Sequence, residues 1–136
     1  MGKIKQNLYQ VYVTEQTNCA QTMFAAGIQS QGDEVPEASS RMLGVYSGGV
    51  SSEAFCGGIL GGAAAIGYLL NHGDEQSFET SKQACREFVE RCRNRLGTTE
   101  CSQIKAVWRK EEIRCYDAVE QIAEELESVL KKYCGQ

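Results

Sequence analysis

Residues 54–70 read AFCGGILGGAAAIGYLL, and this uncharged stretch decides the fold. Gly57 and Gly61, and likewise Gly58 and Gly62, stand four residues apart, so both pairs lie on one face of a helix. Glycine costs about 1 kcal/mol relative to alanine inside a helix, so four of them need a structural reason. A face without side chains lets another backbone come very close. We therefore predict a buried central helix here, packed tightly within the core or across a dimer interface.

A membrane-spanning helix is the main alternative for this stretch. Spanning segments usually have about 20 predominantly apolar residues. The stretch is shorter, rich in glycine, and lacks the flanking basic cluster and aromatic belt of a membrane segment. We therefore predict a soluble protein with no membrane insertion.

Helix signals dominate the chain before this segment. Asn18 is a good N-cap for a helix over residues 19–29. A brief helix is predicted over 36–43 because proline suits a first helical turn, and a short one over 8–13. The glycine- and serine-rich stretch 44–52 is predicted to be a loop.

The second half of the chain continues the helical pattern. Apolar residues recur at helical spacing over 78–96, and Gly97 stands where a C-cap glycine belongs. Thr98 or Thr99 is predicted to cap a short turn, and a final helix, the longest, is expected over about 110–133. The fold class predicted is all-α: a compact bundle of about five main helices around the glycine- and alanine-rich helix, in a single domain over residues 1–136.

Composition excludes several classes of function. The 136 residues are 42% hydrophobic and 24% charged, which is typical of a globular chain. The formal net charge of -4 leaves no basic surface for nucleic acid. His72 is the only histidine, so no Ser-His-Asp or Cys-His catalytic set can be argued. Whether the protein is an enzyme stays open at this point.

Seven cysteines are several times the ordinary number for this length. Their odd count and the polar N-terminus favour cytoplasmic thiols over the disulfides of a secreted protein. No Cys-x-x-Cys pair occurs, which argues against zinc ribbons, thioredoxin-like sites and ferredoxin-like cluster motifs. Cys85 and Cys92 lie on the apolar stripe of one predicted helix and are interpreted as structural hydrophobes. Cys134 receives no role.

The other four cysteines lie near predicted helix starts. Helix N-termini offer free N–H donors and partial positive charge, which stabilise a thiolate and lower its pKa. This placement suits an anionic metal–thiolate cluster or a reactive dithiol, with four unrelated core cysteines as the plainer alternative. If the four act together, their sulfurs should converge on one pocket. The four are Cys19, Cys56, Cys101 and Cys115.

The motif that begins at Cys56 resembles a known family. Cys56-Gly57 with Gly61 is similar to the core of the redox-active protein family named for its C_GCAxxG_C_C signature, except that Gly58 stands where alanine is usual. Three further segments resemble those around the other family cysteines: Asn18-Cys19-Ala20, Arg95-Leu96-Gly97 followed by Cys101, and Arg114-Cys115. The resemblance implies a helical fold, kinship with domains that accompany haem and iron–sulfur proteins, and genes that often lie near transporter genes. Covalent haem attachment is excluded, because the chain has no Cys-x-x-Cys-His motif.

Four functional hypotheses follow. The first is an electron-transfer protein whose four cysteines hold an iron–sulfur cluster, with Gly57 and Gly61 as backbone support. The others are a metal-free thiol–disulfide or sensing protein, a structural zinc site, and a helical interaction module with buried cysteines. The expected partners are an unidentified redox protein, a second copy in a homodimer, and a functionally linked transporter. The expected location is the cytoplasm.

Overall fold

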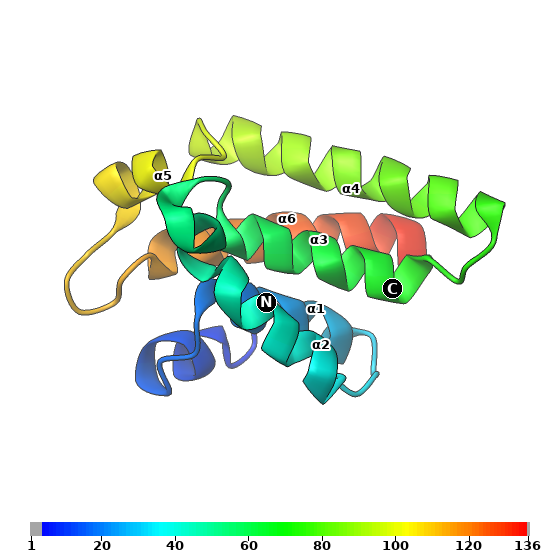
Figure 1. Ribbon diagram of the computed structural model, residues 1–136, viewed down its shortest axis with the longest axis horizontal. Helices are drawn as coiled ribbons and strands as arrows, with labels where there is room; N and C mark the ends of the chain where they lie inside the picture. The colour runs from blue at the N-terminus through cyan, green and yellow to red at the C-terminus, as the bar shows by residue number, and fades with distance from the viewer. Residues whose placement is uncertain (1–3, 136) are drawn as a thin grey trace.

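Helix α3 (Gly57–Leu70) runs through the centre of the fold in the computed structural model, which describes residues 4–135 (Figure 1). Three longer-range neighbours pack around it: α1 (Cys19–Ser30), α4 (Glu75–Leu96) and α6 (Tyr116–Cys134). Extended pairing in the described part of the chain is limited to isolated bridges. The predicted all-α class and the central place of the glycine helix are therefore confirmed.

Short elements connect these helices. They are η1 (Gln10–Thr14), α2 (Glu37–Met42), η2 (Leu43–Tyr46), η3 (Gly49–Glu53) and α5 (Cys101–Trp108). The stretch 44–52, predicted to be a loop, thus contains two irregular helical turns. Gly48 and Gly49 have φ values of +64° and +66°, so the chain reverses here in a conformation that favours glycine. In Figure 1, α5 and the segment that follows it lie together at one end of the molecule.

The glycine face of α3 is covered within the chain. A Cβ atom added at Gly61 would lie 2.1 Å from the carbonyl oxygen of Ala20 in α1. One added at Gly62 would lie 2.5 Å from the ring of Phe88 in α4. The glycines therefore let α1 and α4 close onto α3. The homodimer stays a prediction, but this face is not available as its interface.

Helix ends show where local signals succeed and where they fail. The side chain of Asn18 accepts from the N–H of Gln21 at 2.8 Å, and Gly97 ends α4 with φ +83°, so both predicted caps are confirmed. Residue Glu100 is the N-cap of α5, so neither threonine caps the helix itself, but the Thr98 hydroxyl accepts from the N–H of Glu100 at 3.0 Å in the turn before it.

The prediction for the last helix was wrong, both in the residue at which it starts and in its being the longest helix. Helix α6 begins at Tyr116, and its 19 residues are fewer than the 22 of α4. Lys110 and Arg114 exchange two backbone hydrogen bonds of 2.8 Å, and Arg114 has a left-handed φ of +54°. This tight turn uses the backbone groups that an earlier helical turn would need.

None of the helices in residues 4–135 combines the length and apolarity needed to cross a membrane. The apolar stripe of α6 is buried, as the spacing of its residues predicts. Its buried members are Val119, Ile122, Ala123, Leu126, Val129 and Leu130.

Candidate functional site: a four-cysteine pocket

Two short extended segments place Cys56 beside Cys101. The N–H of Cys56 donates to the carbonyl of Thr99 at 2.7 Å, and the N–H of Cys101 donates to the carbonyl of Ala54 at 2.5 Å. These bonds flank the isolated antiparallel bridge between Phe55 and Glu100. Because α3 and α5 start directly after these segments, the N-termini of both helices lie at the same place.

Cys19 reaches this place through the packing of α1 on α3. It is the first residue of α1, and a Cβ atom added at Gly57 would lie 2.8 Å from its sulfur. The same Cβ would lie 2.6 Å from the carbonyl oxygen of Tyr46. Glycine at 57 therefore leaves the space that the Cys19 side chain uses. Gly61, one turn further along α3, is where the backbones of α1 and α3 meet.

Cys115 completes the group as the N-cap of α6. Its N–H donates to the hydroxyl of Tyr12 at 3.4 Å. The guanidinium of Arg114 donates to the backbone carbonyl of Tyr12 and lies 4.0 Å above the centre of its ring. This contact ties the turn before α6 to the N-terminal segment.

The four cysteines line one pocket of about 200 Å³. Cys56 and Cys101 are buried in it, and Cys19 and Cys115 are half-buried. Side chains from every neighbouring segment complete the lining, and they include Tyr12, Asn18, Ser47, Lys105, Arg109 and Arg114. The structure thus brings together the four residues that the sequence selected, and their chemical role stays a prediction.

The remaining cysteines lie elsewhere. Cys92 is fully buried in the core and outside the pocket lining, although its thiol is close enough to that of Cys56 to interact electrostatically. Cys85 is half-buried in a separate groove with Phe55 and Val89, so it is less enclosed than its apolar spacing suggests. Cys134 is half-buried at the end of α6. All seven thiols are free.

Burial, not the helix N-terminus, controls the thiol pKa values. Burial raises the pKa of Cys56 to about 12, although the nearby backbone N–H groups of Ile59 and Gly58 act in the opposite direction. Burial likewise raises the pKa of Cys101 and of Cys115. The expectation that helix starts would lower these pKa values was therefore wrong, because removal from water outweighs the helix contribution.

This shift predicts a loss of stability in alkali. Cys56 stays protonated in the folded chain up to about pH 12, whereas an unfolded thiol ionises near pH 9. Between these values the unfolded chain binds fewer protons, so the free energy of unfolding falls as pH rises, by at most about 1.4 kcal/mol per pH unit for one group. Urea unfolding at pH 8, 9 and 10 should show a shallower decline for Cys56→Ala than for the parent chain. Equal slopes would contradict the assignment to Cys56.

Sequence reasoning missed the cationic side chains of the pocket. Lys105 and Arg109 stand four residues apart on α5 and at its C-cap, which is an ordinary pattern for a solvated helix face. The sequence pointed to Arg114 only as the neighbour of Cys115 in the family pattern, and not as a pocket residue. These residues come together because α6 packs near α3, and no local sequence pattern predicts that packing.

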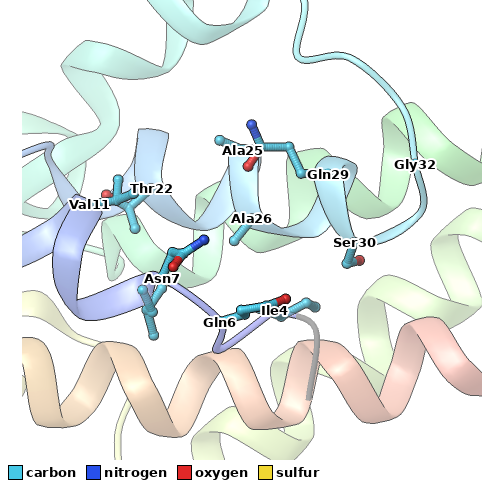
Figure 2. A pocket seen from close by; sticks show the side chains of 11 residues that line it. Ile4, Gln6, Asn7, Val11, Thr22, Ala25, Ala26, Gln29, Ser30 and Gly32 are labelled. Carbon is cyan, nitrogen blue, oxygen red and sulfur yellow. The ribbon is translucent and has the colours of Figure 1, made fainter. Parts of the chain in front are cut away.

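A second cavity of about 480 Å³ lies between α1 and the segment that precedes it (Figure 2). Among residues 4–135 its lining carries no cysteine and no charged side chain, but it includes Gln6, Asn7, Thr22 and Gln29. The Thr22 hydroxyl is buried and has no hydrogen-bond partner within residues 4–135.

Replacing Thr22 with valine is expected to raise the free energy of unfolding by about 1 kcal/mol. The change keeps the shape of the side chain and removes a hydroxyl that is buried without a partner. The matched control is Thr80→Val on the partly exposed face of α4, expected to change stability by less than about 0.5 kcal/mol. A less stable Thr22→Val chain would show that the hydroxyl is hydrogen-bonded in solution.

These features define the class of protein: an all-α chain that gathers four cysteines from four segments around one pocket. The chain belongs to the C_GCAxxG_C_C family, described as "Putative redox-active protein", whose family model matches residues 17–129. The match includes all four pocket cysteines, and it confirms the resemblance seen in the sequence. Comparison with curated proteins and with solved structures gave no match.

Proposed function

We propose that the pocket is a redox centre in which the thiolates of Cys19, Cys56, Cys101 and Cys115 hold an iron–sulfur cluster for electron transfer. The observation that carries this proposal is the convergence of four thiols, from segments far apart in the sequence, on one pocket of about 200 Å³. Four cysteine thiolates are the usual ligand set of such clusters. When bound, the cluster supplies a one-electron redox couple.

The donors around the pocket fit an anionic group of this kind. The backbone N–H groups of Gly58 and Ile59, in the first turn of α3, lie near the sulfur of Cys56 and lower its pKa, and N–H donors close to cluster sulfurs tune reduction potential. Cationic side chains stand in the same lining. The raised thiol pKa values are compatible with ligation, because a coordinating metal deprotonates a thiol outright.

A single zinc ion fits less well than a cluster. Zinc–sulfur bonds of about 2.3 Å would hold all four sulfurs close around one point. In the part of the chain that the structure describes, no three histidine, cysteine or acidic side chains are grouped closely enough to hold one ion. A cluster spreads its four ligands more widely, because they are divided among two or four iron atoms.

A metal-free dithiol is the second candidate, and one contact favours it. The Cβ of Cys19 and the sulfur of Cys56 lie 4.0 and 3.8 Å from the same point, the Cβ position of Gly58. Both side chains therefore lie at the start of α3, and the Cys19 thiol acts electrostatically on that of Cys56. Their oxidation would form one S–S bond and release two protons and two electrons to an external oxidant.

The test is the composition of protein purified without oxygen. The cluster proposal expects brown protein with iron and acid-labile sulfide in equal amounts. Stoichiometric zinc would replace the cluster with a structural site. Colourless, metal-free protein in which two thiols per chain oxidise and reduce reversibly would replace it with the dithiol. Colourless protein whose thiols do not cycle would contradict both redox proposals and leave an interaction module.

We also propose that the protein works in the cytoplasm, where thiols stay reduced. Its redox partner would be a separate electron donor or acceptor that docks at the pocket end of the molecule. A functional link to a transporter is a proposal that rests on the family resemblance alone.

A further inference from the structure

The side chains around the pocket are positively charged, whereas the chain as a whole is negatively charged. The protein has a formal net charge of -4. Lys105, Arg109 and Arg114 nevertheless line the pocket, and no carboxylate does so among the described residues. Lys105 forms an ion pair at 3.3 Å with the carboxylate of Glu53, which is mostly exposed and lies outside the pocket lining.

The three cations have different surroundings. Arg114 is held by Tyr12, through the backbone carbonyl and the ring. Arg109 is exposed and lines the pocket together with Cys115, and its positive charge acts to lower the pKa of that thiol. No ion pair joins Arg109 to a carboxylate within residues 4–135. Its guanidinium therefore stands between solvent and the pocket, with donors left over for a ligand.

We propose that this pocket binds small anions, namely carboxylates and oxyanions, with Lys105 and Arg109 as the groups that hold them beside the sulfur of Cys115. Guanidinium and ammonium groups are the usual partners of such anions, and a partly enclosed cationic cleft raises the local concentration of anions. The pocket volume of about 200 Å³ is below the roughly 300–1,000 Å³ of sites for drug-sized ligands, which limits the ligand to a small molecule. The proposal concerns the chain without cofactor and does not depend on the cluster.

The probe is a matched pair of alkylating reagents, iodoacetate and iodoacetamide, used on reduced, metal-free full-length protein. With either reagent the Cys115 thiolate forms an S–C bond, iodide leaves with the C–I electron pair, and buffer takes the thiol proton. The reagents differ in charge but react in the same way. Peptide mapping gives the rate at Cys115 with each reagent, and their ratio is compared with that of 2-mercaptoethanol. Because thiol ionisation affects both rates alike, the ratio reports attraction of the anion.

The ratio of iodoacetate to iodoacetamide rates at Cys115 is expected to exceed that of the free thiol by about tenfold at low salt. Arg109→Gln and Lys105→Gln should each remove most of this preference, and added salt should weaken it. The matched control is Lys110→Gln, which changes net charge equally but at a side chain whose nitrogen lies 2.6 Å from Asp117, outside the pocket lining. That variant should keep the preference.

Two results would overturn the proposal: a ratio equal to that of the free thiol, or equal losses in Arg109→Gln and Lys110→Gln. If Cys115 reacts with neither reagent, fluorescence decides. Trp108 is the only tryptophan and directly precedes Arg109. Its quenching by iodide should fall in Arg109→Gln while quenching by neutral acrylamide stays the same, and unchanged iodide quenching would end the proposal. Neither readout requires a cluster, so failure of the proposed redox function is recognised separately.

Discussion

Replacing Gly61 with alanine is expected to lower the free energy of unfolding by about 3–5 kcal/mol. The new Cβ would lie 2.1 Å from the carbonyl oxygen of Ala20 and 2.8 Å from its carbonyl carbon. Both atoms belong to backbone inside helix α1, so no flexible side chain can move aside. The helices must separate, which also exposes the apolar side chains packed around them. Leucine at this position is expected to prevent folding.

The matched control is Gly67→Ala, in the same helix. A Cβ at Gly67 meets nothing within 4 Å, so this change should raise stability by about 0.5–1 kcal/mol through helix propensity. Urea unfolding followed by circular dichroism measures both variants. If Gly61→Ala proves as stable as Gly67→Ala, α1 and α3 do not approach as the structure has them. The pocket geometry at Cys19 would then need revision too.

Serine substitution of the pocket cysteines is expected to remove at least about nine-tenths of the iron and sulfide from anaerobically purified protein. The largest loss is expected for Cys56→Ser, because Cys56 is buried directly before the first turn of α3. The control is Cys85→Ser, whose side chain lies in a separate groove and should keep the full metal content. Iron and sulfide analysis, with the visible spectrum, measures each variant.

The pattern across the four cysteines separates the two redox candidates. A cluster needs all four thiolates, so each single variant should lose it. A dithiol of Cys19 and Cys56 needs only those two, so reversible thiol oxidation should survive Cys101→Ser and Cys115→Ser. Equal metal content in Cys56→Ser and Cys85→Ser would contradict the cluster at this pocket.

The sequence by itself determined the features that depend on neighbours along the chain. The i, i+4 glycine pairs predicted a close backbone contact on α3, and Ala20 makes that contact. Asn18 and Gly97 predicted a helix start and a helix end that the structure has. The placement of Cys19, Cys56, Cys101 and Cys115 near helix starts, with the C_GCAxxG_C_C pattern, selected the residues that line the pocket. Caps and periodicity are local, so a sequence carries them directly.

Tertiary structure alone decided the surroundings of those cysteines. Helix α6 begins at Tyr116 and not at 110, after a tight turn in which Arg114 is held by Tyr12 of the distant N-terminal segment. Arg109 and Tyr12 line the pocket because α5, α6 and the N-terminal segment meet there. The pKa of Cys56 rises although it stands at a helix start, because burial depends on every element that covers it. Desolvation and convergence are sums over segments distant in the chain, and no local pattern encodes them.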